Sequence, residues 1–170
     1  MTRGLAVLCV AAGALLVLPA AALACANEQS RPEMMSVRSY ARTVECVVNE
    51  QRVRAGLRAL RHDRRLSRAA RRYSNSMVRQ GFFAHVSPQG STLGQRARNA
   101  GYRGSKLGET IGWASGTLAT PAAIVQAWMD SPPHRSIIMD GSFRKLGLGV
   151  ATGSPAGVQG ASTVTADFGT

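Results

Sequence analysis

Two of the three histidines in this chain lie in short motifs that are typical of turns. His85 begins the run His-Val-Ser-Pro at 85–88, and His134 belongs to Ser-Pro-Pro-His-Arg at 131–135. Between them, Glu109 lies in Gly-Glu-Thr-Ile at 108–111. Imidazole changes its charge near neutral pH and is a common metal ligand, and a carboxylate complements it. We therefore expect folding to bring His85, Glu109 and His134 into one site.

Several kinds of chemistry are open to such a cluster. Two neutral imidazoles and a carboxylate can hold zinc with one position left for water, as in a hydrolytic site. The same groups can form a hydrogen-bonded polar core around a cleft, or the cleft can bind a peptide or small ligand without a reaction. A nucleophilic Ser87 or Ser131 beside a histidine is a further alternative, although neither serine lies in the Gly-x-Ser-x-Gly turn of α/β hydrolases.

The N-terminal segment predicts that the protein is exported. Arg3 precedes an apolar run from Leu5 to Leu18, and the small residues Ala22 and Ala24 provide a cleavage site, so residues 1–24 are expected to be a removed signal peptide. The run is shorter than the roughly 20 apolar residues of a transmembrane helix. We expect a secreted, extracellular monomer that is not transmembrane; the alternative is a lipid anchor at Cys25.

Two cysteines, Cys25 and Cys46, remain after the signal peptide is removed. An even number of cysteines in an oxidising compartment favours a disulfide, so we expect Cys25 to pair with Cys46. The bridge would fix an N-terminal arm, 25–36, to the first helix. Residues 37–170 then suit one domain.

The chain is strongly basic, with a formal net charge of +12. The excess is concentrated in a band of arginines: Arg52, Arg54, Arg58, Arg61, Arg64, Arg65, Arg68, Arg71, Arg72 and Arg79. Such a band attracts anionic surfaces, including wall polymers, anionic lipid and nucleic acid. Few aromatic residues interleave with it, so specific nucleic-acid binding is not expected. A solvated arginine-rich face is the simpler interpretation.

The hydrophobic periodicity, together with the capping and turn residues, predicts helices in the first part of the chain and strands in the last part. Helices are expected over 37–55, 63–81, 92–100 and from Pro121 to the prolines at 132–133, and strands over 145–151 and 162–168 as an antiparallel hairpin. Glycines at 104, 108, 112 and 116 predict a loop-rich passage around Glu109. This order favours an α+β domain with helices packed on a small antiparallel sheet.

The expected elements also give the two histidines their surroundings. His85 follows an apolar stretch that should be buried. His134 should lie just past a helix end, near the negative end of its dipole, which favours a protonated or a cation-facing imidazole. Trp113 is a candidate cleft wall, and His62 is expected in a surface loop.

In these motifs the chain resembles bacterial members of the CAP superfamily, the cysteine-rich secretory proteins, antigen 5 and pathogenesis-related 1 proteins, also called SCP domains. The order and spacing of the motifs carry the resemblance: Asn49-Glu50-Gln51-Arg52, His85 with Ser87-Pro88, Gly108-Glu109-Thr110-Ile111, Trp128-Met129, Ser131-Pro132 with His134-Arg135, Gly147-Leu148-Gly149 and Asp167-Phe168-Gly169.

The resemblance implies an α-β-α sandwich with a central cleft, where two histidines and acidic residues bind a divalent cation such as zinc in some members. By position, His85 and His134 would face the cation, Glu109 would be the carboxylate beside them, and Arg135 would lie in the cleft. If the chain is an enzyme, Glu109 is the candidate catalytic residue. Asn49 and the neighbouring arginine of helix one are expected to tie that helix to nearby loops.

Two departures from the family pattern affect this site. Thr110 stands where the family usually has Asn, and Pro133 replaces a glycine before His134. The second acid of the family's cluster has no clear match, Asp130 being only nearby in the sequence. We therefore expect a secreted binding module at or outside the cell envelope, for a divalent cation and a peptide, small-molecule or cell-wall ligand. The alternative is a secreted metal-assisted hydrolase with a peptide or cell-wall substrate.

Overall fold

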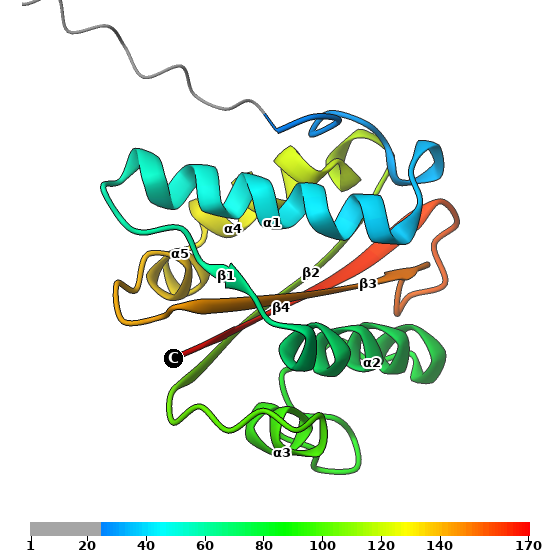
Figure 1. Cartoon of the computed structure of the whole chain (residues 1–170). Coiled ribbons are helices and arrows are strands. Elements are labelled where there is room, and N and C mark those ends of the chain that lie inside the picture. Colours follow the sequence, from blue (N-terminus) through cyan, green and yellow to red (C-terminus); the bar gives the residue numbers. More distant parts are fainter. Residues whose placement is uncertain (1–24) are drawn as a thin grey trace, which may run out of the picture.

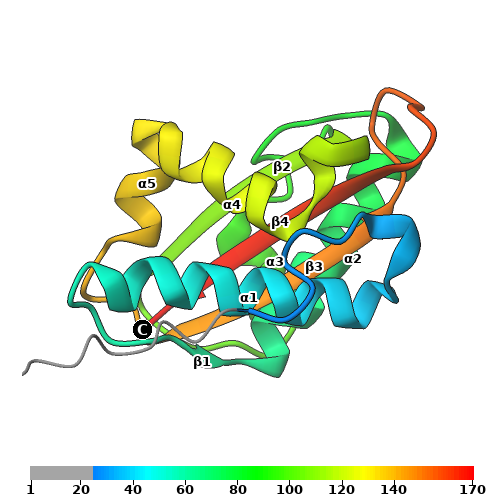
Figure 2. The ribbon, with the colours of Figure 1, turned by 90° about the horizontal axis from the view of Figure 1, so that it is seen from above.

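Residues 25–170, which the computed structural model describes, form a four-stranded sheet between two layers of helices. The expected signal peptide lies outside the described residues. In chain order the elements are a 3-10 helix (Pro32–Met34), α1 (Val37–Arg54), β1 (Arg61–His62), α2 (Arg64–Gln80), α3 (Leu93–Asn99), β2 (Leu107–Ser115), a 3-10 helix (Gly116–Ala119), α4 (Pro121–Asp130), α5 (Pro132–Ile138), β3 (Lys145–Thr152) and β4 (Ala161–Gly169). Helices α1, α4 and α5 cover one face of the sheet, and α2 and α3 cover the other (Figures 1 and 2). The expected α-β-α sandwich is confirmed.

The strands follow the spatial order β1-β3-β4-β2. Strand β4 pairs antiparallel with both β3 and β2, so the expected terminal hairpin is confirmed. The sheet as a whole is mixed rather than antiparallel, because the two-residue β1 pairs in parallel with the start of β3. No helix within residues 25–170 combines the length and apolar character needed to cross a membrane.

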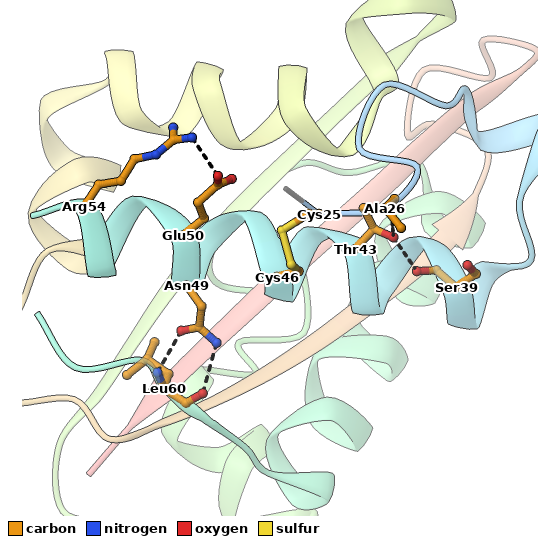
Figure 3. The surroundings of a disulfide bond; sticks show 9 residues. All are labelled: Cys25, Ala26, Ser39, Thr43, Cys46, Asn49, Glu50, Arg54 and Leu60. Carbon is orange, nitrogen blue, oxygen red and sulfur yellow. Dashed lines mark hydrogen bonds and ion pairs between the residues drawn. A yellow bond between two sulfur atoms is a disulfide. The ribbon is translucent and has the colours of Figure 1, made fainter. Parts of the chain in front are cut away.

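A disulfide between Cys25 and Cys46 fixes the N-terminal arm to α1, as expected (Figure 3). Beside it, Thr43 Oγ1 donates a hydrogen bond to the carbonyl of Ala26 at 3.3 Å. The arm also contacts α4, since the carbonyl of Glu28 accepts from a backbone N–H at the start of that helix. Residues 25–36 are therefore held against the helical layer of α1 and α4.

Helix α2 packs unusually close to β3 because two glycines face it. The helix begins at the cap Asp63, as predicted, and ends at Gly81, which adopts the left-handed conformation. A Cβ at Gly147 or Gly149 would lie only 2.2 or 2.0 Å from backbone nitrogens of α2. These glycines allow the helix backbone to rest directly on the strand, which explains the Gly-Leu-Gly run at 147–149.

The passage around Glu109 is a strand, not the expected loop. All nine residues of β2 pair with β4. The prediction was wrong because Gly108 and Gly112 do not form turns; they make room for neighbouring side chains. A Cβ at Gly108 would lie 2.9 Å from Phe143, and one at Gly112 would lie 3.0 Å from Trp128. The strand carries Glu109 through the interior of the molecule.

Arg52 is fully buried and so is not part of the solvated arginine band in which the sequence placed it. Its guanidinium donates to the carbonyls of Arg58, Ile138 and Asp140. Asn49 on the same helix exchanges two hydrogen bonds with the backbone of Leu60 (Figure 3). Both residues tie α1 to the segments that follow it, as expected.

Candidate functional site

His85 lies between α2 and α3, with 54% of its side chain exposed. The stretch that precedes it is not buried as expected. Phe82 packs edge to face on Tyr73, but Phe83 is 46% exposed. The chain turns away from the sheet after the left-handed Gly81, so only one of the two phenylalanines reaches the core. His85 is consequently accessible to solvent.

Glu109 is buried in β2, and both of its carboxylate oxygens are engaged. Oε1 lies 2.8 Å from Nδ1 of His85, and Oε2 accepts from Nη2 of Arg96 at 2.5 Å. An ionised carboxylate can only accept, so this bond assigns the His85 proton to Nδ1. With the proton on Nδ1, a neutral ring keeps its lone pair on Nε2, which is the arrangement in which a carboxylate orients a metal-binding histidine.

Arg96 on α3 is the central cation of this cluster, and the sequence analysis missed it. Its Nη1 donates to the carbonyls of His85 and Ser91, and its guanidinium carbon lies 3.4 Å from the centroid of the Tyr73 ring. The arginine thus joins the His85 segment to Glu109 and to α2. The capping residues of α3 predict where the helix begins. No local sequence signal, however, distinguishes Arg96 from the many arginines on the surface.

A further buried acid, Asp167, lies beside Glu109, and it too was missed as a site residue. It lies on β4 directly opposite Glu109 and is fully buried. Neither of its oxygens has a hydrogen-bond partner among the described residues. Burial raises the pKa of Asp167 well above its usual range, and the negative charge of Glu109 raises it further. Asp130 instead lies exposed at the end of α4, bonded to Gln126.

His134 lies in the first turn of α5 rather than past the end of a helix. Ser131 both ends α4 and caps α5, and the two prolines after it occupy the first turn, where proline is well tolerated. Burial lowers the pKa of His134, and the charge that His85 carries when it is protonated lowers it further. The expectation of a protonated imidazole is therefore wrong, because burial disfavours the charged form; the alternative, a cation-facing imidazole, stays a prediction. Its Nδ1 lies 2.9 Å from Oγ of Ser131.

An apolar groove of about 390 Å³ lies beside His134. Its walls include Phe83, Trp113, Leu118 and Trp128, so Trp113 does line a cleft. Phe83 and Leu118 are large exposed apolar residues at this groove. A groove of this kind suits an apolar group of a ligand, placed next to the imidazole of His134.

The donor atoms of His85, Glu109 and His134 do not converge as a three-ligand cation site among the described residues. Glu109 is already held by both oxygens, and Arg135 is exposed and forms no side-chain hydrogen bond with it. Within residues 25–170, three potential ligand side chains gather within 4.8 Å of one another only at Cys25, Glu28 and Glu50, where the cysteine is consumed by the disulfide.

Comparisons with known proteins agree with this architecture. The model of the cysteine-rich secretory protein family, CAP, matches residues 47–168. The protein YkwD of Bacillus subtilis (strain 168) is 35% identical over 120 residues, which cover 70% of this chain and 46% of YkwD. The membrane protein YlbC of the same organism is 31% identical over 104 residues, or 61% of this chain and 29% of YlbC. This chain thus spans less than half the length of these relatives.

Two solved structures share the fold. An extracellular protein containing a SCP domain from Bacillus anthracis str. Ames superposes with a TM-score of 0.68 at 26% identity, covering 78% of this chain and 40% of that one. An outer surface protein from Borrelia burgdorferi superposes with a TM-score of 0.69 at 18% identity, covering 79% of this chain and 95% of that one. On the family match over residues 47–168, the chain belongs to the CAP family of cysteine-rich secretory proteins.

Proposed function

We propose that this protein is an exported binding module that presents Nε2 of His85 and Nε2 of His134 to a divalent cation. One observation carries the proposal. In both rings Nδ1 already has a partner, Glu109 for His85 and Ser131 for His134, while neither Nε2 atom has one among the described residues. A lone pair on Nε2 of a neutral, oriented imidazole is the donor that zinc prefers in histidine sites.

Two imidazoles leave room in the cation's coordination shell. Zinc takes about four ligands in proteins, so about two positions would remain for water or for an oxygen of a bound ligand. When bound, the cation would supply positive charge that attracts an anionic group. The neutral state of His134, favoured by its lowered pKa, keeps its lone pair available at neutral pH.

The apolar groove supplies the second half of the binding site. Trp113 and Leu118 offer an apolar wall next to His134, and Phe83 belongs to the segment that leads to His85. A peptide, small-molecule or cell-wall ligand that combines an apolar group with a carboxylate or phosphate would satisfy both parts.

Several observations support export. The Cys25–Cys46 disulfide is stable in an oxidising compartment. The structural relatives are an extracellular protein and an outer surface protein. The composition of residues 1–24 is that of a secretory signal peptide. A lipid anchor at Cys25 would compete with the disulfide, because both require its sulfur.

A secreted hydrolase is the second candidate, and the pair Ser131–His134 favours it. Their 2.9 Å separation and the neutral state of His134 are what a histidine needs to accept a hydroxyl proton. The test is turnover of peptide and peptidoglycan substrates by the wild type, Ser131→Ala and Glu109→Gln. Turnover by the wild type that is lost in either variant, with the fold retained, would establish catalysis. If no substrate is turned over by the wild type, the binding module remains the proposed function.

Zinc titration by calorimetry tests the proposed function. We expect one zinc per chain for the wild type and no binding for His85→Ala/His134→Ala. His62→Ala is the matched control, since His62 is a half-exposed histidine that pairs with Glu45 and lies outside the proposed site. Binding that survives the double substitution would refute the site.

A further inference from the structure

A second groove, of about 530 Å³, lies at the edge of the sheet between α1 and α2. We call it the edge groove. Leu148, Gly149 and Val150 of β3 form its floor. Its walls come from the two helices that lie on opposite faces of the sheet (Figure 1). It shares no lining residue with the groove beside His134.

The floor of the edge groove is an open strand edge. Strand β1 pairs only with Lys145 and Leu146 and then ends. The N–H of Asp63 donates to the carbonyl of Leu146 at 2.8 Å, so the peptide groups of Leu146 point away from β4. Because a strand alternates with a period of two, the peptide groups of Leu148 and Val150 point the same way, into the edge groove. Such groups are a template for a further strand.

The walls of the edge groove carry an excess of positive charge. Five arginines line it, two from α1 and three from α2: Arg38, Arg42, Arg64, Arg68 and Arg71. All five are exposed, and none forms an ion pair within the described residues. The one acid in the lining, Glu45, lies 2.9 Å from Nδ1 of His62. The free guanidiniums therefore favour an anionic occupant.

We propose that the edge groove binds an acidic peptide segment in extended conformation, which adds to β3 as an extra strand. Main-chain hydrogen bonds to Leu148 and Val150 would hold its backbone. Side chains of a strand alternate between its two faces, so they would point toward α1 and α2 in turn. Since both helices present arginines, acidic residues are expected on both faces. A second copy of this chain is the wrong occupant, because it would bring two sets of arginines together.

Fluorescence anisotropy with the peptide Glu-Glu-Thr-Val-Glu-Glu tests the charge requirement. We expect saturable binding to the disulfide-bonded protein that weakens as salt is added. Arg42→Glu/Arg68→Glu should lower the affinity by about tenfold or more. Arg72→Glu/Arg79→Glu makes the same change of charge at exposed positions of α2 outside the edge groove, and it should bind as the wild type does.

N-methylation of the peptide tests strand addition separately from charge. Two peptides of the same sequence are N-methylated at odd or at even positions. A strand turns only every second N–H toward its neighbour. One of these peptides should therefore bind with the affinity of the parent peptide, and the affinity of the other should fall by about tenfold or more. Equal affinity of both would overturn strand addition.

Two further outcomes would also overturn the proposal. Polyphosphate that binds the wild type while the acidic peptide does not would identify the edge groove as a surface for anionic polymers. Binding of neither probe would mean that the arginines only protect the strand edge from pairing.

Discussion

Glu109 on β2 lies directly opposite Asp167 on β4, and both carboxyl groups are buried. Two adjacent buried acids do not both ionise easily. His85 and Arg96 bond the two oxygens of Glu109 and stabilise its charge, whereas Asp167 has no such partner among the described residues. In this cross-strand pair Glu109 orients His85, and the raised pKa of Asp167 favours the neutral form of the acid behind it.

Asp167→Asn should stabilise the protein increasingly as pH rises. The native pKa of Asp167 is raised above the unfolded value of about 3.9. Its protonated form therefore contributes stability that is full below about pH 4 and is lost as pH rises through the native pKa. Asparagine keeps the shape of the side chain and cannot ionise. The difference in the free energy of unfolding between the variant and the wild type should therefore increase in favour of the variant by at most about 1.4 kcal/mol per pH unit. Urea unfolding from about pH 4 to about pH 7 measures this gain; a difference that does not change with pH would contradict it.

The imidazole of His134 should titrate below the ordinary histidine pKa of about 6.5. Burial is the main cause and the charge of His85 the second, so His85→Ala should raise the pKa of His134 without restoring it fully. Because the native pKa is lowered, the stability linked to His134 is present above about pH 6.5 and is lost as pH falls through the native pKa. NMR titration of the ring protons reports both values. A wild-type pKa at or above about 6.5 would show that the ring is not desolvated.

Arg52→Met should destabilise the fold by about 3 kcal/mol. The substitution leaves three carbonyls, those of Arg58, Ile138 and Asp140, without their donor, and the bond to Ile138 is fully buried. Arg54→Met on the same helix is the matched control. Arg54 is exposed and, within residues 25–170, pairs only with Glu50, so its loss should change the free energy of unfolding by no more than about 0.5 kcal/mol. Equal effects of the two substitutions in urea unfolding would argue against a structural role for Arg52.

Cys25→Ser/Cys46→Ser should lower the free energy of unfolding by about 3 kcal/mol, because the bridge closes a loop with a sequence separation of 21. The detached arm also loses its contact with α4. Unfolding of the variant and of the oxidised wild type in urea gives the difference. An unchanged free energy would mean that the hydrogen bonds of the arm hold it without the disulfide.

The sequence predicted most of the helices because their caps and apolar periodicity are local signals. Asp63 and Gly81 bound α2, and Thr120 with Pro121 starts α4, as these residue types indicate. Strand β2 could not be recognised, because the side chains that fill the space beside Gly108 and Gly112 come from distant parts of the chain. The same glycines would mark turns elsewhere.

The site was predicted only in part, for a similar reason. His85, Glu109 and His134 stand out by type and motif, and Glu109 does contact His85. Arg96 joins the cluster because α3 packs against β2, and Asp167 joins it because β4 pairs with β2. No local sequence pattern shows either contact. Arg135, taken as a cleft residue on its position in the motif, is exposed, and its place in the cleft stays a prediction.

Nitrogen NMR of the histidine rings during zinc titration tests the central claim most directly. We expect the Nε2 resonances of His85 and His134 to shift together and to saturate at one zinc per chain, while their Nδ1 resonances change little and those of His62 do not change. Shifts at Nδ1, at His62 or at only one of the two rings would contradict a cation site built from the two Nε2 atoms.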